Sequence, residues 1–263
     1  MHVSCVASAR VSEDFVEDMK KRYGEDSPAY HVRVLGNFPP SEEDTVIPVS
    51  LIEHAMANDI KIDEDTPAVW GLDVARQGND SSVLARRQGP VIHPLTTWRN
   101  LDLMQLTGAV KAEYDILPPS KRPVEIIVDS NGFGAGVLDR LRELDLPARG
   151  LNVSERSSQK ETYLNLRAEL WFKAKEWLEG MDVRLPKDDG LYADLAAPRY
   201  HFTSSGKMQV EGKEAMKKRG VNSPDRADAV CLCLANQHTT MAFGRSSSGS
   251  WNKPIRRSIR GVV

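Results

Sequence analysis

Two short apolar stretches each carry an aspartate where a carboxylate is costly unless it has a partner. The first is VWGLDVAR (69–76), which Asp73 interrupts, and the second is VEIIVD (124–129), which ends on Asp129. Strands covered on both faces are apolar, so a charge there requires an ion pair, hydrogen bonds or a metal ion. Asp73 and Asp129 are therefore candidate metal ligands. The alternatives are a turn cap for Asp73 and an Asx turn for Asp129.

A further acidic pair occurs late in the chain, in SPDRADA (223–229). Asp225 and Asp228 are three residues apart on a predicted helix, so both project from one face. The helix dipole favours a carboxylate near the helix N-terminus, and this alone accounts for Asp225. Asp228 lies one turn further, beside the apolar residues 229–232, where an unpaired charge is costly.

Together these acids fit the coordination of a hard divalent cation. Mg²⁺ and Mn²⁺ prefer oxygen ligands and accept sites that water and phosphate complete. Two such ions about 4 Å apart can activate water and stabilise the leaving oxygen in phosphodiester hydrolysis. The predicted catalytic residues are also the predicted ligands of two Mg²⁺ or Mn²⁺ ions: Asp73, Asp129, Asp225 and Asp228.

Other common sites do not match the sequence. The glycines at 132, 134 and 136 do not have the spacing of a dinucleotide fingerprint, and no Lys-Ser or Lys-Thr pair follows them. The serine-rich stretch 244–250 lacks the lysine of a phosphate-binding loop. Three cysteines form neither a disulfide framework nor a four-ligand zinc site, and we expect core thiols at Cys231 and Cys233.

The composition is that of a soluble globular protein. The chain has 263 residues, 40% hydrophobic and 27% charged, with a net charge of -2. This charge gives no global sign of nucleic-acid binding, so such a surface must come from local patches. Candidate contacts to a DNA backbone are Arg76 and the lysines of the basic run 213–219, namely Lys213, Lys217 and Lys218; the alternative is solvated surface charge. No signal peptide or long apolar run is visible, which favours a cytoplasmic location and no membrane partner.

The elements that must position the acids follow an α/β order. The patterns predict three consecutive antiparallel strands, a helix closed by two prolines, a strand, a helix, a further strand and then helices. The ranges are 69–75, 81–87, 91–98, 102–117, 124–129, 134–144, 147–152, 161–179 and 223–236, with short strands near 183, 200–203 and 207–210. This order is typical of the ribonuclease-H-like fold, a mixed sheet with helices on both faces. Within it we expect Trp171 and Trp177 in the core and a structural or ion-pairing role for Arg167.

Three regions are expected along the chain. Residues 1–60 contain short elements that cannot form a core alone and should pack on the main domain. Residues 61–240 form the ribonuclease-H-like domain. Residues 241–263 are serine-rich and basic and read as a flexible tail.

The three acidic blocks, GLDVAR (71–76), VDSNGFG (128–134) and SPDRADA (223–229), resemble the nuclease domain of tailed-phage terminase large subunits. The similarity spans residues 66–236. It implies an endonuclease that cuts concatemeric viral double-stranded DNA during packaging, in the host cytoplasm. It also implies that 1–60 is the end of an upstream ATPase-type region, and that the partners are that region, the small terminase subunit and the portal.

Two other functions stay open at this point. One is another ribonuclease-H-like DNA nuclease, of the resolvase or transposase type. The other is a non-catalytic packaging-motor module, in which the acids are relics or ion-pair partners. The ATPase motifs of the resembled family are not found in these residues.

Overall fold

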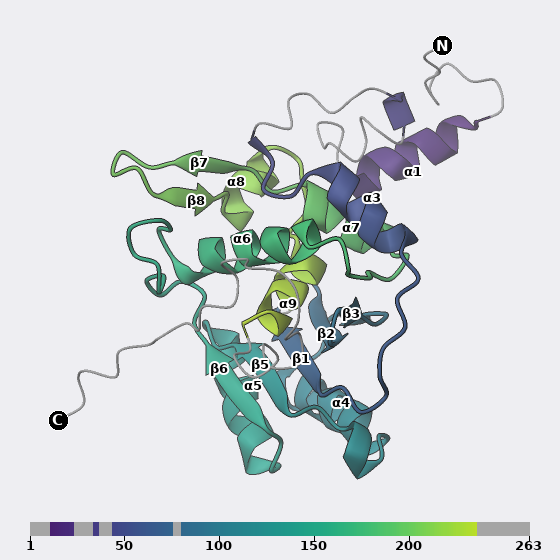
Figure 1. Ribbon diagram of the computed structural model, residues 1–263, viewed down its shortest axis with the longest axis vertical. Coiled ribbons are helices and arrows are strands. Elements are labelled where there is room, and N and C mark those ends of the chain that lie inside the picture. Colours follow the sequence, from purple (N-terminus) through teal and green to yellow (C-terminus); the bar gives the residue numbers. More distant parts are fainter. Residues whose placement is uncertain (1–10, 24–33, 37–43, 76–79, 236–263) are drawn as a thin grey trace.

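A mixed six-stranded sheet forms the centre of the fold (Figure 1). The computed structural model describes residues 11–23, 34–36, 44–75 and 80–235. The strand order is β3-β2-β1-β5-β6, and β4 pairs with β2 beside this path. Their bounds are β1 (Ala68–Asp73), β2 (Ser82–Gln88), β3 (Val91–Ile92), β4 (Thr96–Trp98), β5 (Glu125–Asp129) and β6 (Ala148–Leu151). The antiparallel β1–β2 pair and the parallel β1–β5 and β5–β6 pairs confirm the expected mixed sheet.

The third antiparallel strand is broken in two. The sequence predicts one strand over 91–98, but β3 ends at Ile92 and β4 begins only at Thr96. Pro94 lies in the gap, and proline has no N–H to donate to a strand partner. Both pieces still pair antiparallel with β2.

Side chains alternate between two apolar layers, one on each face of the sheet. Trp70 and Leu72 of β1 share a buried cluster with Ile126 and Val128 of β5 and with residues of α4 (Leu103–Asp115) and α5 (Phe133–Glu143). Val69 and Ile127 belong to the opposite cluster, which includes α6 (Leu166–Glu179) and α9 (Asp225–Cys233). Helices therefore cover both faces, as expected.

Helix α9 lies directly against β1. A Cβ atom placed on Gly71 would lie 2.3 Å from the backbone oxygen of Ala229 and 2.9 Å from the backbone nitrogen of Cys233. No side chain fits between strand and helix at this point, so only glycine permits this approach. The sequence predicts a helix over 223–236, but α9 begins at Asp225 and ends at Cys233, and the Ser223 hydroxyl donates to the Asp225 carboxylate.

Helices α3 (Val49–Ala57) and α7 (Asp189–Ala196) and the hairpin of β7 (Tyr200–Phe202) and β8 (Met208–Val210) lie on the side of the molecule that holds α6 (Figure 1). Helix α3 packs on α6 and on α7, a helix that the sequence analysis did not predict. Helix α6 begins at Leu166, capped by Asn165, and not at 161 as expected. The other elements are α1 (Glu13–Tyr23), the 3-10 turn η4 (Pro119–Lys121) and α8 (Lys213–Lys218).

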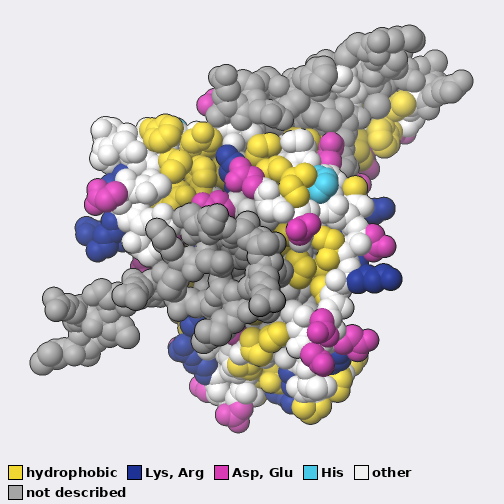
Figure 2. Space-filling view, in the orientation of Figure 1, with side chains coloured by type: hydrophobic (Ala, Val, Ile, Leu, Met, Phe, Trp, Pro, Cys, Tyr) yellow, Lys and Arg dark blue, Asp and Glu magenta, His cyan; other side chains and the backbone are white. Residues whose placement is uncertain are grey.

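Hydrophobic side chains gather on the surface over the β7–β8 hairpin, at the upper left of Figure 2. Phe202 is 64% exposed there. No helix in the described part of the chain is both long and apolar enough to cross a membrane. The expected tail at 241–263 and most of the first 43 residues lie outside the described residues.

We expect Gly71→Ala to destabilise the protein, because its methyl group must displace α9 from β1. Overpacking of this kind costs about 1–3 kcal/mol or more. Thermal unfolding followed by circular dichroism measures the change. The control is Gly108→Ala in α4, where a Cβ meets nothing within 4 Å and alanine is the better helix former. An unchanged melting temperature for Gly71→Ala would show that the close approach is not a constraint.

Candidate metal centre

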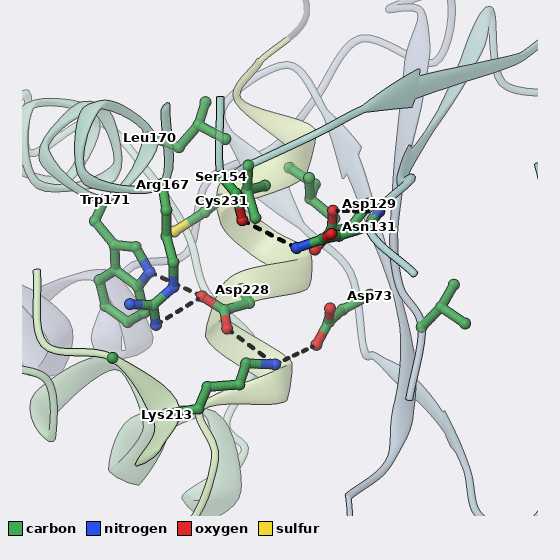
Figure 3. A pocket seen from close by; sticks show the side chains of 14 residues that line it. Asp73, Asp129, Asn131, Ser154, Arg167, Leu170, Trp171, Lys213, Asp228 and Cys231 are labelled. Carbon is green, nitrogen blue, oxygen red and sulfur yellow. Dashed lines mark hydrogen bonds and ion pairs between the residues drawn. The ribbon is translucent and has the colours of Figure 1, made fainter. Parts of the chain in front are cut away.

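Asp73 and Asp129 lie side by side at the ends of two neighbouring parallel strands. The register pairs Leu72 with Val128, so the next residue of each strand is one of the two aspartates. Because Val69 and Ile127 face α9, alternation places Asp73 and Asp129 on the same face. Both aspartates line a cavity of about 270 Å³ (Figure 3). The two carboxylates that the sequence placed on separate strands therefore meet at one site.

The ammonium group of Lys213 joins three of the four acids. Its Nζ lies 3.3 Å from Oδ2 of Asp73, 3.1 Å from Oδ1 of Asp225 and 3.3 Å from Oδ2 of Asp228. Lys213 is the first residue of α8 and was predicted as a contact to a DNA backbone, with solvated surface charge as the alternative; its ammonium group points instead into the acidic cluster. Over the described residues, no three Asp, Glu, His or Cys side chains already stand close enough together to hold a metal ion. The carboxylates are instead arranged around a cation that belongs to the protein.

The two acids of α9 have different surroundings. Asp225 is 6% exposed, and its Oδ2 accepts a hydrogen bond from the Ser81 backbone N–H at 2.9 Å. Its other oxygen accepts from the Ser223 hydroxyl as well as from Lys213, and Asp225 is not among the residues that line the cavity. Asp228 does line the cavity. Asp225 thus fixes the start of α9, while Asp228 faces the open space.

Two residues of α6, Arg167 and Trp171, contact the same oxygen of Asp228. The indole Nε1 of Trp171 donates to Oδ1 of Asp228 at 2.8 Å, and a guanidinium nitrogen of Arg167 lies 3.3 Å from the same oxygen (Figure 3). Trp171 is buried, as predicted, and Arg167 forms an ion pair, as predicted. The sequence did not predict that Trp171 and Arg167 both contact Asp228. Their spacing of one helical turn, i and i+4, was the available signal.

Burial raises the pKa of Asp73 to about 7, against the attraction of Lys213 and with the help of Asp228, Asp225 and Asp129. Burial alone would lower the pKa of Lys213, but Asp73, Asp228 and Asp225 together hold it above its usual value. The pKa of Asp228 is lowered because Arg167, Lys213 and the Trp171 N–H outweigh its burial. Burial and repulsion between carboxylates thus oppose the charge of Asp73, whereas Arg167 and Lys213 favour the charge of Asp228.

Asp129 is held at the turn that follows β5. Its Oδ1 accepts from the Asn131 backbone N–H at 3.1 Å, which is the Asx geometry that the sequence analysis gave as an alternative. The Asn131 side chain then donates to the Ser154 hydroxyl at 2.9 Å. Burial raises the pKa of Asp129, and the N–H groups of Asn131 and Val153 oppose this rise. Asp129 therefore accepts the hydrogen bond of an Asx turn and also lines the cavity.

The other candidate residues are dispersed. Arg76 lies outside the described residues. Lys217 is 3.4 Å from Oδ2 of Asp80 and its side chain is 55% exposed, and Lys218 is exposed on the same helix. Cys231 and Cys233 are buried free thiols, as expected.

Comparison with known proteins supports the resemblance seen in the sequence. No protein-family model matches the chain. The chain is 26% identical over 243 residues to a protein of Enterobacteria phage P7 named as a probable terminase large subunit. This match covers 86% of the chain and 49% of the P7 protein, so the chain spans about half the length of that relative.

Solved structures show the same fold. The nuclease domain of the large terminase subunit gp2 of bacterial virus Sf6, as a K428A mutant with manganese and beta-thujaplicinol, matches with a TM-score of 0.61 and 19% identity. The match covers 72% of this chain and 97% of that one. The large terminase nuclease of thermophilic phage G20c with bound magnesium matches with a TM-score of 0.54 and 16% identity, over 73% and 97% of the two chains. The ribonuclease-H-like fold and the resemblance to terminase large-subunit nuclease domains are confirmed.

We predict that Asp73→Asn stabilises the protein relative to wild type, increasingly so as the pH rises. The folded pKa of Asp73 is raised from 3.8 to about 7, so the folded state binds this proton more tightly than the unfolded state. The resulting stability is complete below pH 3.8 and is lost as the pH rises through about 7. Asparagine has no such loss, so the difference in melting temperature should grow by several degrees between pH 5 and pH 8.

Thermal unfolding in a chelating buffer measures this difference. Asp139→Asn, a change at an exposed residue of α5, is the control and should give a constant offset. A pH-independent offset for Asp73→Asn as well would contradict the raised pKa.

Proposed function

We propose that the chain is a metal-dependent endonuclease that hydrolyses phosphodiester bonds of viral double-stranded DNA during genome packaging. The observation that carries this proposal is the convergence of carboxylates from β1 and α9 on one cationic group, beside Asp129 of β5. The ribonuclease-H-like fold and the named relatives support a terminase nuclease over a resolvase or transposase. The Sf6 nuclease structure contains manganese, and the G20c nuclease structure contains bound magnesium.

The donor atoms of the site are carboxylate oxygens, which suit a divalent cation. Asp73 and Asp228 each give one oxygen to an ammonium ion, and hard divalent cations also take carboxylate oxygens. The positive charge of Lys213 therefore stands where the charge of a metal ion is needed. We assign the ligands as Asp73, Asp129 and Asp228, with Asp225 supporting them from the start of α9, and we propose two Mg²⁺ or Mn²⁺ ions.

Each part of the chain has a distinct task in this proposal. Divalent cations at such a site lower the pKa of water and stabilise charge on the attacking and leaving oxygens. The sheet supplies two acids at a fixed separation, because Asp73 and Asp129 follow paired residues of neighbouring strands. Helix α9 supplies the others, and Gly71 lets it come close enough to do so. Lys213 offsets part of the negative charge of the cluster until cations enter.

The DNA backbone would run past α8. Lys217 and Lys218 are exposed on this helix, whose first residue reaches into the site. Phosphate contacts by lysines position a duplex without reading its sequence. We propose Lys217 and Lys218, together with Arg76, as such contacts.

The same proposal gives partners, location and domain organisation. A terminase nuclease acts with a packaging ATPase region, a small terminase subunit and a portal, in the host cytoplasm. We propose residues 61–240 as the nuclease domain, 1–60 as the end of the ATPase-type region and 241–263 as a basic tail. The packing of α3 on α6 and α7 agrees with an N-terminal segment that docks on the main domain.

Cleavage of supercoiled plasmid DNA tests the proposal. We expect Mg²⁺- or Mn²⁺-dependent nicking that falls at least about 100-fold in Asp73→Asn and in Asp129→Asn, a loss of about 2.7 kcal/mol. The exposed Asp139→Asn should retain the wild-type rate. Wild-type nicking that survives in both site variants would remove the assignment.

Metal affinity tests the role given to Lys213. Lys213→Ala removes the competing ammonium group, so we expect the dissociation constant of Mn²⁺ to fall about tenfold, or about 1.4 kcal/mol. Isothermal titration calorimetry measures it. Lys217→Ala, from the exposed face of the same helix, is the matched control. Unchanged or weaker Mn²⁺ binding in Lys213→Ala would show that the lysine does not compete with the metal.

A further inference from the structure

The carboxylate of Asp228 is bound unequally at its two oxygens. Oδ1 accepts from the Trp171 indole at 2.8 Å and lies 3.3 Å from Arg167, while Oδ2 has Lys213 at 3.3 Å (Figure 3). Trp171 and Arg167 approach from α6, on one side, and Lys213 approaches from the cavity. Oδ1 is therefore contacted by two groups of α6, and Oδ2 by Lys213 alone among the described residues, although all three groups line the cavity.

The two groups that hold Oδ1 are themselves fixed. Trp171 is fully buried in the core between α6 and α9. The Arg167 guanidinium lies over the Trp171 ring, 5.7 Å from its centroid, and Nη1 of Arg167 donates to the Glu211 carbonyl at 2.7 Å. Rotation of the Asp228 carboxylate would break both contacts to Oδ1 at once.

The different contacts of the two oxygens restrict how Asp228 can coordinate a cation. Trp171 and Arg167 together crowd Oδ1, so Oδ2 is the oxygen of Asp228 that an incoming metal ion would reach. Ca²⁺ accommodates six to eight oxygens and often takes both oxygens of one carboxylate, whereas Mg²⁺ requires a compact octahedron with single oxygens. We propose that Arg167 and Trp171 are positioning residues that hold Asp228 in one-oxygen geometry and thereby favour Mg²⁺ over Ca²⁺ at the site.

This inference rests on the proposed metal site, but it is tested by metal binding and not by DNA cleavage. Isothermal titration calorimetry of Mg²⁺ and Ca²⁺ with the folded chain gives the ratio of the two dissociation constants. Trp171→Phe keeps an aromatic ring in the core and removes the N–H donor. Groups that orient metal ligands are worth about 10- to 100-fold in affinity. We expect Mg²⁺ binding to weaken at least about tenfold and Ca²⁺ binding to change much less.

The matched control is Trp177→Phe. Trp177 is a buried tryptophan on the same helix and is not among the residues that line the cavity. The control should lose similar core volume while keeping the wild-type preference for Mg²⁺. An equal loss of both metals in the two tryptophan variants would assign Trp171 a purely structural role and overturn the inference.

Arg167→Lys provides an independent variant if Trp171→Phe fails to fold. Lysine keeps the charge and loses the planar guanidinium that spans the indole ring, Asp228 and Glu211. We expect the same direction of change, a weaker preference for Mg²⁺. An unchanged preference in every folded variant would overturn the inference and leave the proposed function intact. Failure of the wild-type chain to bind either metal would instead remove the proposed function.

Discussion

The approach of α9 to β1 is the constraint on which the site depends. Because Gly71 has no side chain, the backbone of the helix lies directly against the strand. Asp225 and Asp228 are thereby brought to the sheet edge where Asp73 and Asp129 end their strands. A larger residue at Gly71 would separate the helical acids from the strand acids. The chemistry of the cluster is thus set by packing at a residue that carries no functional group.

Gathering these acids has an electrostatic cost that the rest of the site offsets. Burial and mutual repulsion raise the pKa of Asp73, so its charge is unfavourable in the folded protein without a cation nearby. Lys213 supplies one positive charge, and Arg167 supplies another behind Asp228. A divalent metal ion would bring two positive charges where Lys213 brings one, and this difference is the electrostatic basis of the proposed Mg²⁺ or Mn²⁺ site.

Much of this site was predictable, since local patterns govern the strands. Apolar runs that contain an aspartate, with Asp73 inside one run and Asp129 at the end of the other, predicted that both lie on strands, and i, i+3 spacing placed Asp225 and Asp228 on one helix face. The position of Lys213 was not predictable, because a long side chain bridges residues up to 140 positions away. The roles of Arg167 and Trp171 also depend on how α6 crosses α9. The break at Pro94 could have been predicted from proline chemistry alone, and the Asp188 cap with apolar residues at 191, 192, 195 and 196 is a helical signal that was missed for α7.

The central claim is that Lys213 occupies the place of a metal cation among the carboxylates. Anomalous diffraction from crystals of the chain grown with Mn²⁺ tests it most directly. The account predicts a Mn²⁺ peak in the cavity, bound by Asp73 and by the Oδ2 atom of Asp228, with the Lys213 ammonium displaced from both. A Mn²⁺-saturated structure in which the Lys213 contacts persist and manganese binds elsewhere would contradict it.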